Sequence, residues 1–179
     1  MDLIKSIKQS IEIIRLNNSV IENVAKNKSA TNAGILILIL GGIIAGLMGN
    51  ESVLLMIFLT PIITLIFSFI GVGVLHGLAK LFKGKATFME LYRVLTHASI
   101  INWLVVFSNI PILNMIIPIA TGVWGLVVNF TAIKKLYKLS TGKAVLVMVI
   151  PMVAAMILTI IGMSIYLYFN PGGLSTLSQ

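Results

Sequence analysis

The sequence has 179 residues, of which 58% are hydrophobic and only 10% are charged. Soluble domains have about 45–50% apolar and about 25% charged residues, and a soluble fold of this size has too little interior for so many apolar side chains. Soluble enzymes, disordered chains and fibrous proteins are therefore excluded. The chain contains no cysteine, which excludes disulfides, thiolate metal sites and cysteine nucleophiles.

Residues 1–30 are predicted to form cytoplasmic amphipathic helices. Apolar residues recur there at helical spacing, at Leu3, Ile4, Ile7, Ile11 and Ile14. Asn17 and Asn18 interrupt this pattern, and Ser19 with Glu22 fits a capping box that begins a second short helix. We expect the apolar stripe either to lie in the membrane interface or to pack on the membrane domain.

Five long apolar runs follow, and a membrane-spanning helix needs about 17–25 residues. The expected spans cover residues 31–48, 53–79, 94–110, 112–133 and 144–169, with a short outside tail at 170–179. The third and fourth spans belong to one run that either crosses twice or forms a re-entrant pair, and we favour two crossings. The fold class is therefore all-α, a polytopic membrane protein with a five-helix domain over residues 31–169.

The charges predict the orientation of this bundle. The net charge is +8, and all 13 Lys and Arg residues fall on one side if the N-terminus is cytoplasmic and the C-terminus is outside. We expect a multi-pass protein of the cell membrane, or of an endomembrane in a eukaryote. The side chains expected to bind anionic lipid head groups or a cytoplasmic protein are Lys5, Lys8, Arg15, Lys80, Lys83, Lys85, Arg93, Lys134, Lys135, Lys138 and Lys143. Nucleic acid is not an expected partner, because the basic residues form separate patches beside the membrane.

Small and polar residues repeat along the spans. In lipid, such residues let helices approach closely, and GxxxG spacing also suggests a homo-oligomer. The residues expected to pack helices together are Gly42, Gly46, Gly73, Gly77, Gly122, Gly125 and Asn129. The alternative is that polar stripes line a substrate path, with Thr60, Thr64 and Ser68 on one span and Asn102 and Asn129 on two others.

Ionisable residues are absent from the centres of the expected spans, which argues against an ion pump or a proton-driven carrier. His76 and His97 lie near the cytoplasmic ends of adjacent spans, and with Glu90 they could supply three metal ligands. We favour the alternative, in which water or backbone groups satisfy the two histidines. The sequence contains no nucleotide-binding or hydrolase motif, so no catalytic residue, cofactor or metal is expected.

Residues 76–94, which read HGLAKLFKGKATFMELYRV, resemble the second-to-third span connection of the Yip family. These are five-span membrane proteins first defined by binding to Ypt/Rab GTPases. Residues 124–144 are similar to the family's fourth span and its loop into the fifth, and the resemblance covers most of residues 1–170. The segment also contains a second expected capping box, Thr87 with Glu90.

The resemblance implies a five-helix bundle with a cytoplasmic N-terminus. In eukaryotic relatives it implies vesicle traffic, with prenylated Rab-type GTPases as partners. The N-terminal region here is short and lacks the Asp-Leu-Tyr-Gly-Pro type of motif, so the chain looks like the prokaryotic branch. The expected function is a non-catalytic integral membrane scaffold or adaptor that acts through its basic cytoplasmic face. The alternative is a small solute transporter or channel.

Overall fold

The computed structural model describes residues 2–49 and 52–170, and the regular structure in these residues is entirely helical. Its elements are α1 (Leu3–Ile14), α2 (Asn18–Lys26), α3 (Ala30–Leu47), α4 (Val53–Leu81), α5 (Phe88–Ala98), the 3₁₀ helix η1 (Ser99–Asn109), α6 (Leu113–Tyr137) and α7 (Thr141–Phe169). Five of the described segments are long and apolar enough to cross a membrane: α3, α4, α5 continued by η1, α6 and α7. The predicted all-α class with five candidate spans is therefore confirmed. The third span begins at Phe88 rather than at Val94, because the helix capped by Thr87 continues directly into it.

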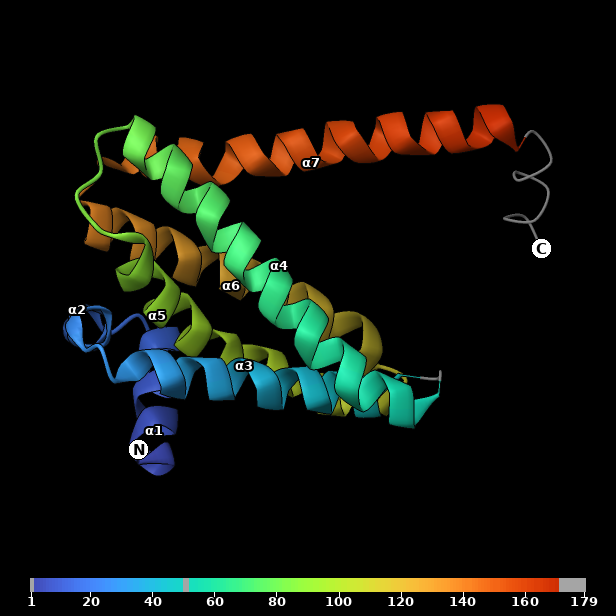
Figure 1. Ribbon diagram of the computed structural model, residues 1–179, viewed down its shortest axis with the longest axis horizontal. Helices are drawn as coiled ribbons and strands as arrows, with labels where there is room; N and C mark the ends of the chain where they lie inside the picture. The colour runs from blue at the N-terminus through green and yellow to red at the C-terminus, as the bar shows by residue number, and fades with distance from the viewer. Residues whose placement is uncertain (1, 50–51, 171–179) are drawn as a thin grey trace.

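The α3–α4 hairpin forms one side of the bundle (Figure 1), and α3 also packs against α5 and η1. The α3–α4 contact is close because two glycines of α3 lie against α4. A Cβ atom added to Gly42 would lie 2.6 Å from the Cα of Pro61, and one added to Gly46 would lie 2.5 Å from the carbonyl oxygen of Met56. Dispersion contacts over small residues are what hold helices together in lipid, where no hydrophobic drive acts between them.

The other predicted packing glycines are placed differently. A Cβ atom added to Gly73, Gly77, Gly122 or Gly125 would meet no atom of the described residues within 4 Å. These four glycines therefore do not bring two helices of this chain together, because no second helix lies over the helix surface on which they sit. Glycine spacing indicates that one surface of a helix is flat. It does not indicate which element packs against that surface. A contact with a second copy of the chain stays a prediction.

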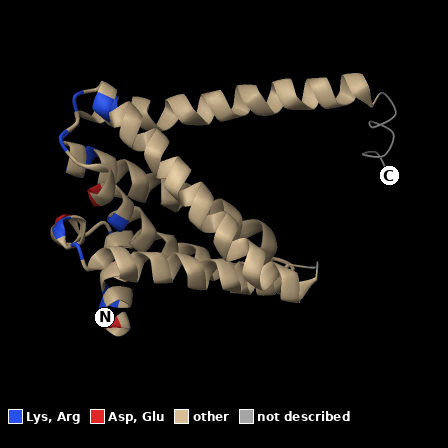
Figure 2. Ribbon diagram, viewed as in Figure 1, with Lys and Arg blue, Asp and Glu red and all other residues tan. Residues whose placement is uncertain are grey.

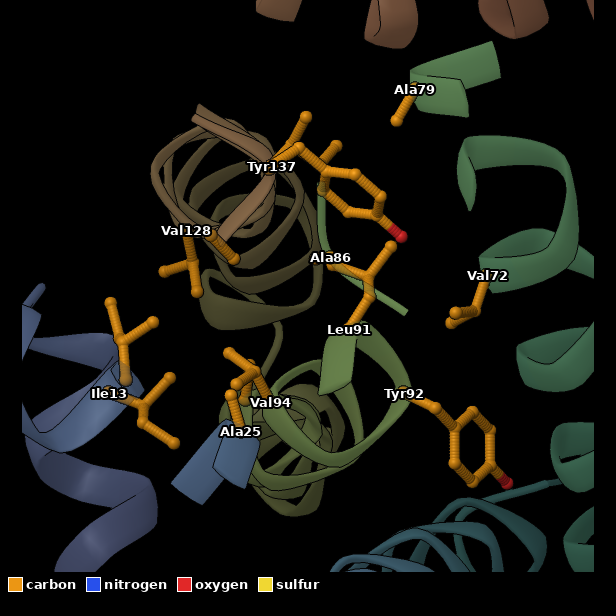
Figure 3. Close-up of a cluster of buried hydrophobic side chains, with 14 of the residues drawn as sticks. Ile13, Ala25, Val72, Ala79, Ala86, Leu91, Tyr92, Val94, Val128 and Tyr137 are labelled. Atoms are coloured by element: carbon orange, nitrogen blue, oxygen red, sulfur yellow. The ribbon is translucent and has the colours of Figure 1, made fainter. Parts of the chain in front are cut away.

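The best-packed core lies at the end of the bundle where α1, α2, α5 and α6 meet (Figure 3). Ile13, Leu91 and Val94 are fully buried there, and Val128 and Tyr137 are 1% exposed. The two N-terminal helices are thus part of the folded bundle. By contrast, α7 buries only Ala144 and Val147 near its start and then diverges from the other helices (Figure 1).

Helix α1 packs through a different face from the one that its apolar stripe predicts. Its buried residues are Ser6, Ser10 and Ile13, whereas Ile4 is 69% exposed and Ile11 is 37% exposed. The indole Nε1 of Trp124 on α6 donates a hydrogen bond to the carbonyl oxygen of Ile14 at 2.7 Å. The two expectations for this segment are therefore compatible. The small serine face contacts the bundle, and part of the apolar stripe remains available to a lipid interface.

Candidate functional site at the basic end

The Lys and Arg residues gather at one end of the bundle (Figure 2), and α7 ends at Phe169 at the opposite end. We call this end the basic end; it comprises residues 2–30, 80–93 and 134–143. These are the segments that the sequence assigns to a single side of the membrane. Which side of the membrane the basic end faces stays a prediction.

The connection between α4 and α5 is folded tightly against the end of α6. Lys83 adopts a left-handed backbone conformation with φ 63°, and Lys80 Nζ donates to the carbonyl oxygen of Gly84 at 3.2 Å. Gly84 is buried, and a Cβ atom there would lie 2.6 Å from Cδ1 of Tyr137. Glycine is the usual residue in a left-handed turn that ends a helix. The structure assigns the left-handed turn to Lys83, and Gly84 is required for the close approach of Tyr137.

The candidate metal ligands have other partners. His76 Nδ1 lies 2.6 Å from the hydroxyl of Tyr137, and His97 Nδ1 lies 2.8 Å from the carbonyl oxygen of Arg93. Glu90 closes the predicted capping box with Thr87, whose backbone N–H donates to Glu90 Oε2 at 2.6 Å. In residues 2–49 and 52–170 no three His, Asp or Glu side chains are grouped so that they could hold a metal ion. The structure therefore does not assemble the site considered for His76, His97 and Glu90.

Arg93 is not part of the accessible basic surface. Its side chain is only 9% exposed, and Nη1 donates to the carbonyl oxygen of Ala25 at 2.7 Å while Nε donates to Thr31 Oγ1 at 2.9 Å. Ala25 lies in the last turn of α2, where carbonyl groups have no partner within the helix. A cation at a helix C-terminus is favourable. Arg93 thus holds the N-terminal segment against the third span, which corrects its assignment to the lipid or partner face.

A basic groove lies between α2 and the end of α6. Its lining includes Asn18, Glu22, Lys134, Lys135 and Lys138. Glu22 Oε1 and Lys135 Nζ form an ion pair at 3.0 Å, and the hydrogen bond from Lys135 lowers the pKa of the Glu22 carboxyl. The lining thus carries three lysines and one carboxylate, so the groove keeps a net positive charge.

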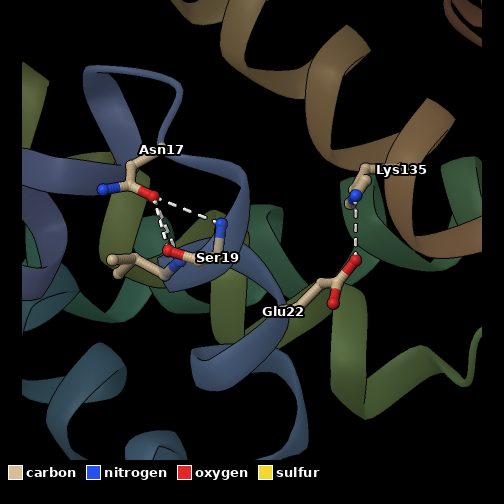
Figure 4. Close-up of polar contacts among 5 residues, drawn as sticks. Asn17, Ser19, Glu22 and Lys135 are labelled. Atoms are coloured by element: carbon tan, nitrogen blue, oxygen red, sulfur yellow. Dashed lines mark hydrogen bonds and ion pairs between the residues drawn. The ribbon is translucent and has the colours of Figure 1, made fainter.

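The expected capping box at Ser19 and Glu22 is wrong. The N-cap of α2 is Asn17, whose Oδ1 accepts hydrogen bonds from the backbone N–H groups of Ser19 and Val20 (Figure 4). Asparagine is as good an N-cap as serine, and it lies at the point where the chain leaves α1. Glu22 is therefore free to contact α6. The side-chain amide of Asn17 also donates a hydrogen bond to Glu12 Oε2. This hydrogen bond, together with the one from Arg15, lowers the pKa of the Glu12 carboxyl.

Two further features of this end have no clear signal in the sequence. Gly34 on α3 lies directly against Thr96 and His97 of α5, so that a side chain at this position would collide with both. Tyr137 is buried between His76 and Gly84, although a tyrosine in the last turn of a span is usually expected at the surface. Both are pairings between distant segments, which a single sequence does not reveal.

The polar residues expected to line a path are partly brought together. Thr64, Ser68, Asn102 and Asn129 line one cavity within the five-helix domain. Thr60, which continues the same stripe on α4, is not part of its lining. The cavity lies among α3, α4, α5, η1 and α6, and it shares no lining residue with the basic groove.

Comparison with known proteins identifies a family. The model of the Yip1 domain matches residues 23–163, which extend from α2 into the last third of α7. No curated protein and no solved structure matches the chain. The match covers most of the chain and contains all five candidate spans in whole or in large part. The chain is therefore a multi-pass membrane protein that belongs to the Yip family.

Proposed function

We propose that this protein is a non-catalytic membrane scaffold whose basic end faces the cytoplasm and binds anionic lipid head groups. The gathering of the Lys and Arg residues at one end of the bundle is the observation that carries the proposal. Each juxtamembrane Lys or Arg contributes about 1 kcal/mol of attraction to an anionic membrane surface. An acidic surface of a cytoplasmic protein is the second kind of ligand that this end would attract.

Two local features support lipid as the first ligand. The groove lined by Lys134, Lys135 and Lys138 retains positive charge after pairing with Glu22. Helix α1 exposes Ile4 and Ile11 beside Lys8 and Arg15, which is the composition of a helix that lies in the membrane interface. Apolar and cationic side chains would then contact the same leaflet.

The proposal is tested by neutralising five lysines together in the full chain, namely Lys83, Lys85, Lys134, Lys135 and Lys138. The protein is reconstituted in nanodiscs that contain phosphatidylcholine and a fluorescent phosphatidylglycerol, and energy transfer from tryptophan to the probe reports enrichment of the anionic lipid. We expect substitution by glutamine to abolish the enrichment. Substitution of the same five residues by arginine is the matched control, because it keeps every charge, and it should preserve enrichment.

Enrichment that is equal in the glutamine and arginine variants would contradict the lipid proposal. Raising the salt concentration should weaken the enrichment in the natural sequence, because exposed charges are screened over about 10 Å at 0.1 M ionic strength. Enrichment that does not depend on salt would also count against it.

A second candidate function is a small solute transporter or channel. The cavity whose lining includes the polar side chains of Thr64, Asn102 and Asn129 favours it. The test is the flux of neutral solutes into vesicles that contain the protein, compared with vesicles that contain the Asn102→Leu variant. A flux that this substitution removes would support transport, and the absence of flux across a broad panel of solutes would remove the candidate.

A further inference from the structure

A cavity lies inside the five-helix domain, with α4 on one side, α6 on the other, and α5 with η1 between them. Its volume is about 610 Å³, which is within the range of about 300–1,000 Å³ found for small-molecule sites. A smaller cavity of about 310 Å³ shares Leu38, Thr64, Ser99, Asn102 and Thr121 with it. The two cavities are therefore adjacent and both lie beside η1; we call them together the hollow.

The lining is mostly apolar, and its polar side chains are uncharged. It contains several hydroxyl groups and two side-chain amides, and no Asp, Glu, Lys, Arg or His among the lining residues. The hydroxyls donate mainly to their own helices: Ser68 Oγ to the carbonyl oxygen of Leu65 at 2.9 Å, and Ser99 Oγ to that of Thr96 at 2.6 Å. Their oxygens remain able to accept a further hydrogen bond.

The side-chain amides of Asn102, which is exposed, and Asn129, which is half-buried, have no hydrogen bond to any other residue that the structure describes. Ser108 Oγ, in the smaller cavity, is buried and also has no partner within the described residues. An unpaired polar group in hydrocarbon costs several kcal/mol. An occupant that carries both donors and acceptors would therefore be stabilised there.

The hollow opens sideways, between α4 and α6. Phe67 and Leu126 line it and are 69% and 40% exposed on the outer surface of the bundle, so they mark its rim. Gly71, Gly122 and Gly125 also line it, and a Cβ atom added to any of them would meet nothing within 4 Å. The glycines of α6 that the sequence assigns to helix packing thus keep this side open to the bilayer.

The third span changes its helical form beside the hollow. It turns from α-helix to 3₁₀ helix at Ser99, and η1 carries Asn102 into both cavities. Long 3₁₀ stretches are uncommon, and in the middle of a helix they often mark a functional position. In membrane proteins, irregular backbone at depth is tolerated where it lines a cavity or is buried in protein.

We infer that this hollow binds the head of an uncharged lipid bearing hydroxyl and ester oxygens, of the diacylglycerol type, which enters from the bilayer between α4 and α6. Asn102 and Asn129 would donate to its ester oxygens, and the hydroxyl oxygens of the lining would accept from its alcohol. Phosphate and ammonium heads are disfavoured because the lining offers no opposite charge to offset their desolvation. The acyl chains would leave over Phe67 and Leu126.

The test uses the full chain in phosphatidylcholine nanodiscs with a diacylglycerol whose glycerol end carries a photoactivated diazirine. We expect adducts on η1 and on residues 121–129 of α6. Gly122→Leu fills the hollow, and Gly73→Leu is its matched control, because Gly73 has equal space but is not part of the lining. Gly122→Leu should remove the adducts, and Gly73→Leu should retain them.

Asn102→Ala tests the polar contacts separately from shape. Loss of hydrogen bonds that contribute about 1 kcal/mol each lowers occupancy about fivefold at low probe concentration. Asn170→Ala, at the end of α7 outside the hollow, should leave labelling unchanged. Circular dichroism and size-exclusion chromatography of each variant show that the fold is kept.

Three outcomes would overturn the inference. Equal labelling of the Gly122→Leu and Gly73→Leu proteins would place the adducts outside the hollow. Equal labelling by a phosphatidic acid carrying the same diazirine would remove the preference for an uncharged head. Displacement of the probe by free glycerol, but not by unlabelled diacylglycerol, would assign the hollow to a water-soluble molecule. The variant with five lysines replaced by glutamine should label normally, so this result is independent of the proposed function.

Discussion

The amide Nδ2 of Asn109 donates a hydrogen bond to Sδ of Met48 at 3.4 Å. Asn109 is the last residue of η1, and Met48 directly follows α3. The turn between the third and fourth spans therefore lies level with the end of the first span. This relationship favours two full crossings for residues 94–133 over a re-entrant pair.

Cysteine labelling checks this topology, since the chain has no cysteine of its own. We expect Gly49→Cys, Asn109→Cys and Asn170→Cys to react with an impermeant maleimide from the outside of sealed cells or vesicles. Lys83→Cys and Lys138→Cys should react only after the membrane is made permeable. If Asn109→Cys reacted together with Lys83→Cys, the third and fourth spans would be re-entrant.

Removal of the Arg93 side chain should destabilise the attachment of the N-terminal helices. Arg93→Met keeps most of the apolar stem but loses the hydrogen bonds to Ala25 and Thr31, and hydrogen bonds from a charged donor contribute about 1.5–3 kcal/mol each. Thermal unfolding in detergent should show a clear decrease in the midpoint. Lys85→Met is the control for an exposed cation. Its free energy of unfolding should differ from that of the natural sequence by no more than about 0.5 kcal/mol, so its midpoint should hardly change. Equal effects of the two substitutions would show that Arg93 is not held as described.

The glycines of the spans should separate into two classes when they are changed to alanine. Gly42→Ala and Gly46→Ala force a methyl group into the backbone of α4, and overpacking of this kind costs about 1–3 kcal/mol. Gly73→Ala and Gly77→Ala meet open space, and alanine is favoured over glycine in a helix by about 1 kcal/mol. Unfolding in detergent should therefore show destabilisation for the first pair and none for the second. The same loss in all four variants would mean that a second chain covers Gly73 and Gly77.

Tyr137→Phe should loosen the junction between α4 and α6. The substitution leaves Nδ1 of His76 without its partner at 2.6 Å, and an unsatisfied polar group costs about 1–3 kcal/mol. The measured unfolding midpoint should decrease by a few degrees, at about 2–4 °C per kcal/mol for a chain of this size. Tyr168→Phe, at an exposed position on α7, is the matched control and should unfold as the natural sequence does. A Tyr137→Phe midpoint equal to that of this control would assign no stability to the His76 contact.

The ion pair of Glu22 with Lys135 should make a small contribution that is lost in acid. The pKa of Glu22 is lowered from the ordinary value of 4.5. Its contribution is complete above that ordinary value and disappears as the pH falls through the lower pKa of the folded protein. The stability difference between the natural sequence and Glu22→Gln should therefore shrink on acidification below pH 4.5. It should also shrink in high salt, since both side chains are accessible to solvent. A difference that is constant with pH would show that the pair is not formed.

The sequence alone predicts five candidate spans, because apolar length is a local property. It also predicts the capping box of Thr87 and Glu90, which depends on residues three positions apart. The face of α1 that contacts the bundle is not predicted correctly. In a soluble protein the apolar stripe would be buried, but beside a membrane lipid can cover Ile4 while the small Ser10 allows close packing.

The sequence predicts that the Lys and Arg residues gather on one side, but it does not predict which of them are exposed at the basic end. Arg93 and Lys138 both belong to its basic segments, yet Arg93 is buried against Ala25 and Lys138 lines an open groove. Arg93 is buried because α2 ends beside it, and only the tertiary structure shows where α2 ends relative to α5. The same holds for Gly122, whose spacing fits helix packing but whose surroundings are an open cavity.

The 3₁₀ form of η1 sets how far the third span reaches. A 3₁₀ helix rises about 2.0 Å per residue and an α-helix about 1.5 Å, so these 11 residues extend about 22 Å instead of about 17 Å. The extra length allows a short apolar segment to end level with Met48. If η1 rewound into an α-helix, Asn109 would move inward by about 5 Å. The thickness of the bilayer core that this protein fits therefore depends on the helical form of this one segment.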